Sequence, residues 1–112
     1  MEVCASAKKL KNKKSSAGDV ISNEIIKIAV EDHATNFVKL FNHVLFHGNF
    51  PHMWSEGYIV PLYKSGCRSD PGNYRGICIS SCLGKFFTSI LNYRLNTFLE
   101  EHQILNKNQI GF

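Results

Sequence analysis

The sequence has 112 residues, of which 44% are hydrophobic and 20% are charged, and its formal net charge is +4. This balance fits one globular domain, or part of a larger one, and argues against wholesale disorder. No apolar run approaches the roughly 20 residues that a membrane-spanning helix needs, so no contact with a membrane is expected. The mild positive charge permits binding to nucleic acid without establishing it.

The first 18 residues are expected to form a basic, flexible arm, and residues 19–112 a folded unit. Lysines crowd this arm at positions 8, 9, 11, 13 and 14. Like charges repel one another and favour an exposed segment. Such an arm can hold a nucleic-acid backbone, but a solvated arm without a ligand is the more common case.

Two helices are predicted after the arm. Asp19 is a plausible N-cap for the first, since its carboxylate can accept backbone N–H groups. The second is expected to open at Glu31 and Asp32, to carry an apolar stripe over residues 37–45 and to stop at Gly48. The apolar face of the first helix is expected to be Ile21, Ile25, Ile28 and Ala29.

A β-hairpin is predicted in the middle of the chain, with strands at residues 58–63 and 74–79. The residues between them contain Asp70-Pro71-Gly72. Proline presets φ and glycine supplies a left-handed position, so this tripeptide is typical of a turn. Pro61 has no N–H and therefore favours an edge position or a bulge for the first strand.

A last long helix is predicted to begin at Ser80 or Ser81 and to end near Glu101. Arg94 falls inside its apolar stripe, and we expect it to snorkel or to pair with a carboxylate or a backbone oxygen. The order α-α-β-β-α, with a central β-hairpin, gives an α+β fold class. The stripe consists of Phe87, Ile90, Leu91, Leu95, Phe98 and Leu99.

The hairpin offers the best candidate for a binding site. Its strand ends and its loop are expected to bring Lys64, Arg68 and Arg75 together. Backbone N–H groups of Gly66 and Gly72 can then face an anion, and a lysine with an arginine suits phosphate oxygens. By charge pattern alone, a solvated loop is the favoured interpretation, because charged loops are commonplace.

Other residues give weaker indications of chemistry. His43 and His47 have a spacing that can hold a metal, but no third ligand accompanies them, so no metal site is expected. Trp54 is interpreted as a core residue rather than a platform for a base. Cys78 and Cys82 are interpreted as small buried groups. The cysteines show no CxxC pair, which favours reduced thiols in an intracellular chain.

The ordered set of motifs resembles the N-terminal fingers region of reverse transcriptases from non-LTR (LINE-type, jockey-like) retrotransposons. It covers the chain from about residue 11 onward. The motifs, in chain order, are KSSAGD at 14–19, PHMW at 51–54, IVPLYKSG at 59–66, DPGNYRGI at 70–77, SSCLGK at 80–85, RL at 94–95 and QIGF at 109–112.

This resemblance implies that residues 19–112 are part of the fingers subdomain of a right-hand polymerase. Lys64 and Arg75 then correspond to the pair that neutralises the nucleotide triphosphate. The implied partners are an RNA template, a DNA primer, a dNTP and, within the same protein, the palm and thumb. The residues implied to contact nucleic acid are Arg68, Asn73, Gln109, Gly111 and Phe112.

The resemblance does not extend to the palm, because the sequence stops at Phe112, before the acidic box of that subdomain. Two-metal phosphoryl transfer needs carboxylates. We therefore expect no catalytic residue, metal site or cofactor in this chain, with Mg²⁺ bound by the intact polymerase alone. Whether the chain is itself an enzyme is left open. The alternatives are a non-catalytic module that binds RNA or single-stranded DNA, and a non-functional pseudogene product. The expected location is the nucleus, the cytoplasm or both.

Overall fold

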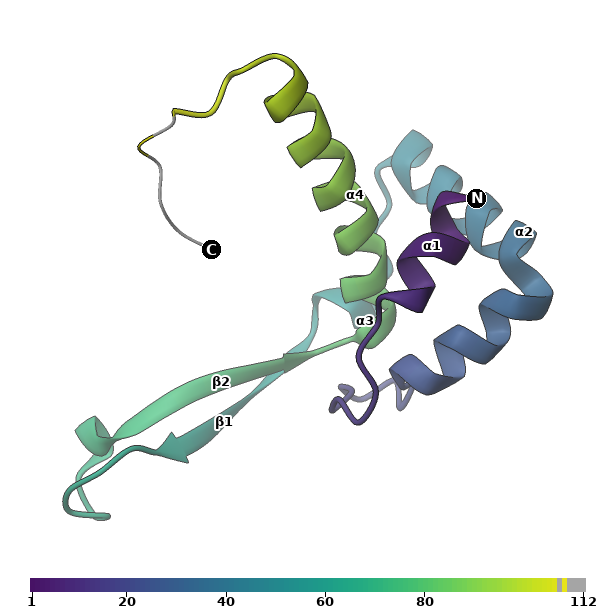
Figure 1. Cartoon of the computed structure of the whole chain (residues 1–112). Coiled ribbons are helices and arrows are strands. Elements are labelled where there is room, and N and C mark those ends of the chain that lie inside the picture. The colour runs from purple at the N-terminus through teal and green to yellow at the C-terminus, as the bar shows by residue number, and fades with distance from the viewer. Residues whose placement is uncertain (107, 109–112) are drawn as a thin grey trace.

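The computed structural model describes residues 1–106 and 108. Helices gather into one body from which a two-stranded hairpin projects (Figure 1). This mixture confirms the expected α+β class. The elements are α1 (Glu2–Lys8), α2 (Asn23–His47), α3 (His52–Ser55), β1 (Gly57–Tyr63), the 3₁₀ turn η1 (Pro71–Asn73), β2 (Tyr74–Ser80) and α4 (Cys82–Glu101).

An aromatic cluster forms the centre of the helical body. Phe86 of α4 is 0% exposed and lies edge-on to Phe41 of α2, with ring centroids 5.5 Å apart. Phe87 and Trp54 belong to the same cluster, and Phe37 and Phe50 pack at its border. Each buried phenylalanine contributes about 1.5–3 kcal/mol through removal of its surface from water. The expected core position of Trp54 is confirmed, whereas Phe86 is absent from the predicted stripe.

The two helices predicted between the arm and the hairpin are halves of one helix, α2. The backbone leaves helical geometry at His33 (φ −126°, ψ 29°), close to the expected boundary. The helix begins after Ser22, whose hydroxyl accepts a hydrogen bond from the Ile25 N–H at 3.4 Å. The expected cap at Asp19 is therefore wrong. Gly48 ends the helix in the left-handed region at φ 69°, as expected.

The buried face of the first half of α2 differs from the predicted one. Ile26 and Val30 are buried, whereas Ile25 and Ile28 are 52% and 65% exposed. The spacing of the apolar residues fits either the predicted or the observed face, because this half of the helix is apolar on more than one side. The contact between α1 and α2 selects the buried face. The tertiary partner thus decides what the hydrophobic pattern leaves ambiguous.

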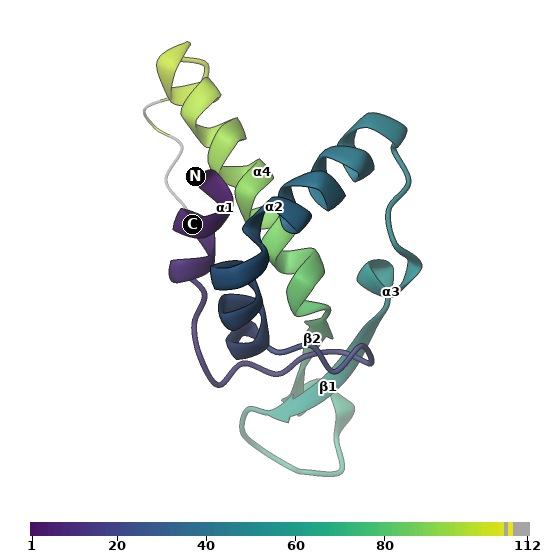
Figure 2. The same ribbon diagram turned by 90° about the vertical axis from the view of Figure 1, so that its right-hand side faces the viewer.

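Helix α1 occupies the start of the expected arm and was not predicted. It lies against α2 and α4 (Figure 2). Its Val3 and Ala7 are buried and belong to the hydrophobic core. Its Glu2 carboxylate accepts two close hydrogen bonds from Arg94 of α4, at 2.6 Å from Nη2 and 2.9 Å from Nε. The expected pairing of Arg94 with a carboxylate is confirmed. A flexible arm is thus the wrong description for residues 2–8, and the division of the chain at residue 18 stays a prediction.

Helix α4 is capped by Ser81, whose hydroxyl accepts from the Gly84 N–H at 3.2 Å. Its N-terminal half lies in the core, and its C-terminal half extends past the other helices (Figures 1 and 2). Leu95 and Phe98 are consequently 55% and 48% exposed. Within the part of the chain that the structure describes, no helix is long and apolar enough to cross a membrane.

Candidate nucleic-acid interface

The candidate site lies on the hairpin, which is present as predicted. Strands β1 and β2 are antiparallel, and their register runs from Gly57 opposite Ser80 to Tyr63 opposite Tyr74. All seven residues of β1 are exposed. The hairpin carries its connecting loop, residues 64–73, away from the helices (Figure 1).

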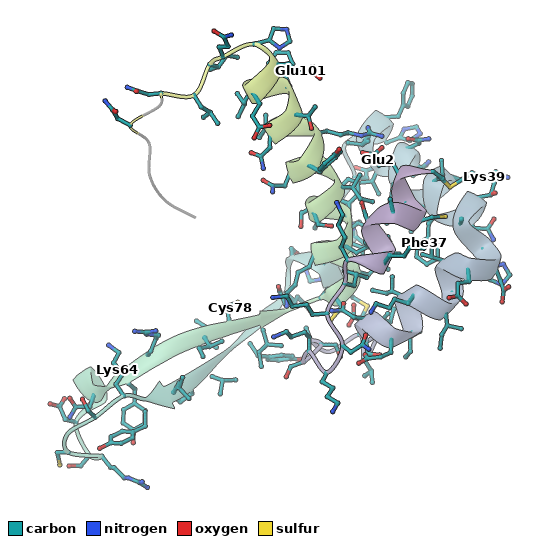
Figure 3. All side chains as sticks on the ribbon, in the orientation of Figure 1. Glu2, Phe37, Lys39, Lys64, Cys78 and Glu101 are labelled. Atoms are coloured by element: carbon teal, nitrogen blue, oxygen red, sulfur yellow. The ribbon has the colours of Figure 1, made fainter. Side chains whose placement is uncertain are left out.

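Lys64 and Arg75 share one face of this hairpin. Arg75 lies opposite Leu62 in the register, and Lys64 follows Leu62 by two residues. The Lys64 N–H donates to the Asn73 carbonyl at 2.8 Å, so the ladder continues into the loop. Side chains alternate between the two faces of a strand. Lys64 and Arg75 are therefore diagonal neighbours, a position in which Cα atoms are roughly 7–8 Å apart. Both are exposed, and Lys64 lies far from the helical body (Figure 3).

Arg68 lies on the opposite face. Its guanidinium carbon is 5.2 Å from the ring centroid of Tyr63, which alternates with Leu62. A cation over an aromatic ring is attracted by the electron-rich face of that ring. The register thus places two of the three expected cations on one face of the hairpin and the third on the other face.

Side chains of the hairpin fix the shape of the loop. The Tyr74 hydroxyl donates to the Arg68 carbonyl at 2.8 Å, and the Asn73 amide donates to the Cys67 carbonyl at 2.8 Å. The Tyr63 hydroxyl donates to the carbonyl of Gly66. Gly66 has φ +89°, and a Cβ there would lie 2.8 Å from the Asn73 amide nitrogen. Asn73 therefore organises the loop, while its contact with nucleic acid stays a prediction.

The turn at Gly72 differs from the expected one. Its N–H donates to the Asp70 carboxylate at 2.9 Å within η1, and its φ lies outside the left-handed region. That N–H is therefore not free to face an anion, contrary to the expectation. An aspartate before a 3₁₀ turn satisfies the first N–H groups locally, so the turn needs no left-handed residue.

The remaining candidates give the following outcome. The rings of His43 and His47 are 4.2 Å apart, and no group of three or more metal-binding side chains occurs among residues 1–106 and 108.

Cys82 is buried as expected, and burial raises the pKa of its thiol. Cys78 is exposed, contrary to the expectation, because it lies on the projecting strand. The proposed contacts at Gln109, Gly111 and Phe112 lie outside the described residues.

Sequence reasoning missed the pairing of two tyrosines at the base of the loop. Tyr63 and Tyr74 end one strand and begin the other, and their ring centroids are 5.7 Å apart. Aromatic residues that flank a predicted hairpin loop on both sides are a signal for such a cross-strand pair.

The chain is similar in sequence to polymerases of mobile elements. The chain is 33% identical over 106 residues to the RNA-directed DNA polymerase from mobile element jockey of Drosophila melanogaster. This chain is homologous to a segment of the polymerases of jockey-like, non-LTR retrotransposons. The match covers 93% of the chain and 12% of the jockey polymerase. The Pol polyprotein of the type-1 element R1 of Bradysia coprophila is 31% identical over 105 residues, which are 92% of the chain and 10% of that protein.

A third relative is the probable RNA-directed DNA polymerase from transposon X-element of Drosophila melanogaster. It is 28% identical over 102 residues, which cover 90% of the chain and 11% of that polymerase. No family model matches the sequence. The chain thus spans about a tenth of the length of the curated retrotransposon polymerases that it matches.

Proposed function

We propose that this chain is a fingers segment of a retrotransposon reverse transcriptase, and that Lys64 and Arg75 bind the triphosphate of the incoming nucleotide. The observation that carries the proposal is the shared face of these two cations at the end of an exposed hairpin. Homology to retrotransposon polymerases supports the class of reaction.

The chemistry of the pair suits a triphosphate. An arginine fork offers two parallel N–H donors and a lysine offers a mobile point charge, so together they can follow a chain of phosphates. Neither side chain takes part in an ion pair within residues 1–106 and 108. Positive groups held in place stabilise the charge that moves onto the leaving pyrophosphate.

The remainder of the active polymerase is proposed to lie outside this sequence. Mg²⁺ and the carboxylates that hold it are assigned to the palm, so the chain alone is expected to lack polymerase activity. The exposed apolar side chains of α4, Leu95 and Phe98, are proposed to pack on that palm. RNA template and DNA primer would then pass along the hairpin.

The direct test is binding of a fluorescent dNTP to the 112-residue chain and to a Lys64→Ala/Arg75→Ala variant. Loss of two charge-assisted contacts is expected to weaken binding at least tenfold. The matched control is Lys8→Ala/Lys39→Ala, which removes the same charge from exposed positions in α1 and α2. Lys39 lies on the helical body, away from the hairpin (Figure 3). Equal weakening in both variants would contradict a site at the hairpin and indicate general attraction to positive charge.

A further inference from the structure

Two histidines lie one turn apart at the exposed end of α2. The ring centroids of His43 and His47 are 4.2 Å apart, and both side chains are exposed. They border a shallow hollow that is also lined by Lys39, Asn42 and Phe46. This end of α2 lies away from the hairpin in both views (Figures 1 and 2). The histidine pair is therefore separate from the proposed triphosphate site.

The helix holds the two imidazole rings side by side. Residues four positions apart are neighbours on the surface of an α-helix. His47 is the last residue of α2, and the Gly48 N–H closes that turn by donating to the Val44 carbonyl at 2.9 Å. The Phe46 ring packs on the His47 ring with their centroids 5.0 Å apart. The backbone thus already has the spacing that a ligand common to both imidazoles needs.

The charge at the end of α2 favours a cation over an anion. The last carbonyl groups of a helix have no N–H partner within it and carry partial negative charge, and His47 lies in that last turn. A neutral imidazole adds a nitrogen lone pair, which transition metals bind. Lys39, one turn before His43, carries an opposing positive charge on an exposed, flexible side chain that can point away from the rings.

The distance between the two rings selects the geometry of the ion. A ring nitrogen lies about 2.0–2.1 Å from a bound metal, which puts the ion roughly 3.2 Å from each ring centroid. Centroids 4.2 Å apart then subtend an angle of roughly 80° at the ion. This angle is close to the right angle between neighbouring ligands of an octahedral or square-planar ion, and it is well below the tetrahedral angle. The pair therefore suits Ni²⁺ better than Zn²⁺.

We propose that His43 and His47 bind a divalent transition metal of octahedral or square-planar geometry, such as Ni²⁺, with water at its other positions. No third protein ligand accompanies the pair among residues 1–106 and 108, which argues against a catalytic or structural site. Two ligands on one rigid helix still hold an exchangeable ion, because the second binds at high effective concentration. Mg²⁺ takes oxygen ligands, so this site is distinct from the metal assigned to the palm and goes beyond the proposed function.

The experiment measures the affinity of the whole chain for NiCl₂ by isothermal titration calorimetry. The exposed thiols of Cys67 and Cys78 can also bind the ion, so every protein in the comparison carries Cys67→Ser and Cys78→Ser. His43→Ala and His47→Ala are each expected to weaken binding at least about tenfold, because a single imidazole lacks the chelating partner. Circular dichroism checks that each variant folds.

His33→Ala is the matched control and is expected to leave the affinity for Ni²⁺ unchanged. His33 is exposed on the same helix, and the residues four positions away from it, Ala29 and Phe37, offer no metal ligand. Weakening in this control as large as in the variants of the pair would overturn the site, as would unchanged binding in either variant of the pair. Competition by MgCl₂ would contradict imidazole ligands, and tighter binding of ZnCl₂ than of NiCl₂ would contradict the octahedral or square-planar geometry.

Discussion

The helical body and the hairpin of this protein are built in opposite ways. In the body, Phe86 is 0% exposed and lies within a cluster of aromatic rings. In the hairpin, every residue of β1 is exposed, and Ile59 reaches 76%. The body is held by removal of apolar surface from water, and the hairpin by its backbone ladder and the hydrogen bonds of its loop.

This contrast separates stability from recognition. A two-stranded hairpin is marginal in water by itself. Here β2 leads directly into the buried start of α4, at Ser81 and Cys82, so the body anchors one end of the hairpin. The other end does not contact the helical body and is held by its own side chains, among them the Tyr63–Tyr74 pair.

The largest effect is expected from Phe86→Ala, which removes the centre of the aromatic cluster. We expect a loss of about 3–5 kcal/mol in the free energy of unfolding, measured by urea titration with Trp54 fluorescence as the probe. Phe46 is 86% exposed, and Phe46→Ala serves as the control with a change within about 0.5 kcal/mol. Similar losses in both variants would show that the cluster is not the source of stability.

A smaller effect is expected at the end of α2. Gly48 has φ 69°, and nothing lies within 4 Å of a Cβ added there. Gly48→Ala is expected to cost about 1–2 kcal/mol through backbone strain alone, and Gly48→Asn less, because asparagine tolerates the left-handed region. Thermal unfolding of the two variants measures the difference. Equal destabilisation would exclude the left-handed backbone as the cause.

The contact between α1 and α4 is expected to depend on pH. The hydrogen bonds from Arg94 hold the pKa of the Glu2 carboxyl below its ordinary value of 4.5. The folded pKa is thus the lower one, so the stabilisation is present above pH 4.5 and is lost as pH falls through the folded pKa.

Arg94→Gln should therefore lower the free energy of unfolding at neutral pH and have little effect in strong acid. Because the pair is partly exposed, the difference is expected to be at most about 1 kcal/mol and to shrink in high salt. Arg75→Gln carries the same charge change on the hairpin and should show no such pH dependence. A constant difference at all pH values would argue against the ion pair.

The smallest effect on stability is expected in the hairpin itself. Ile59→Thr keeps a β-branched residue in the strand and removes exposed apolar surface. The free energy of unfolding, measured by urea titration, should change by no more than about 0.5 kcal/mol. A loss as large as that of Phe86→Ala would mean that this strand is part of the core after all.

The candidate site divides into a part that sequence could predict and a part that it could not. Lys64 and Arg75 follow from strand alternation once the hairpin is recognised, and the structure places them on one face. Arg68 does not follow from alternation, because it lies in the loop, where no period applies. Its position over Tyr63 depends on how the loop folds back, which the bonds of Tyr74 and Asn73 determine.

The sequence by itself determined those helix ends whose hydrogen bonds join residues close together in the chain. Gly48 ends its helix through a bond to Val44, four residues away, and Ser81 caps its helix through Gly84, three residues away. Only the tertiary structure decided the contacts between distant segments. The Ser81 hydroxyl also donates to Asp19, 62 residues earlier, and Glu2 binds Arg94 across 92 residues. Local bonds depend on a few neighbouring dihedral angles, whereas long-range contacts depend on how whole helices pack, and many packings satisfy the same pattern of apolar residues.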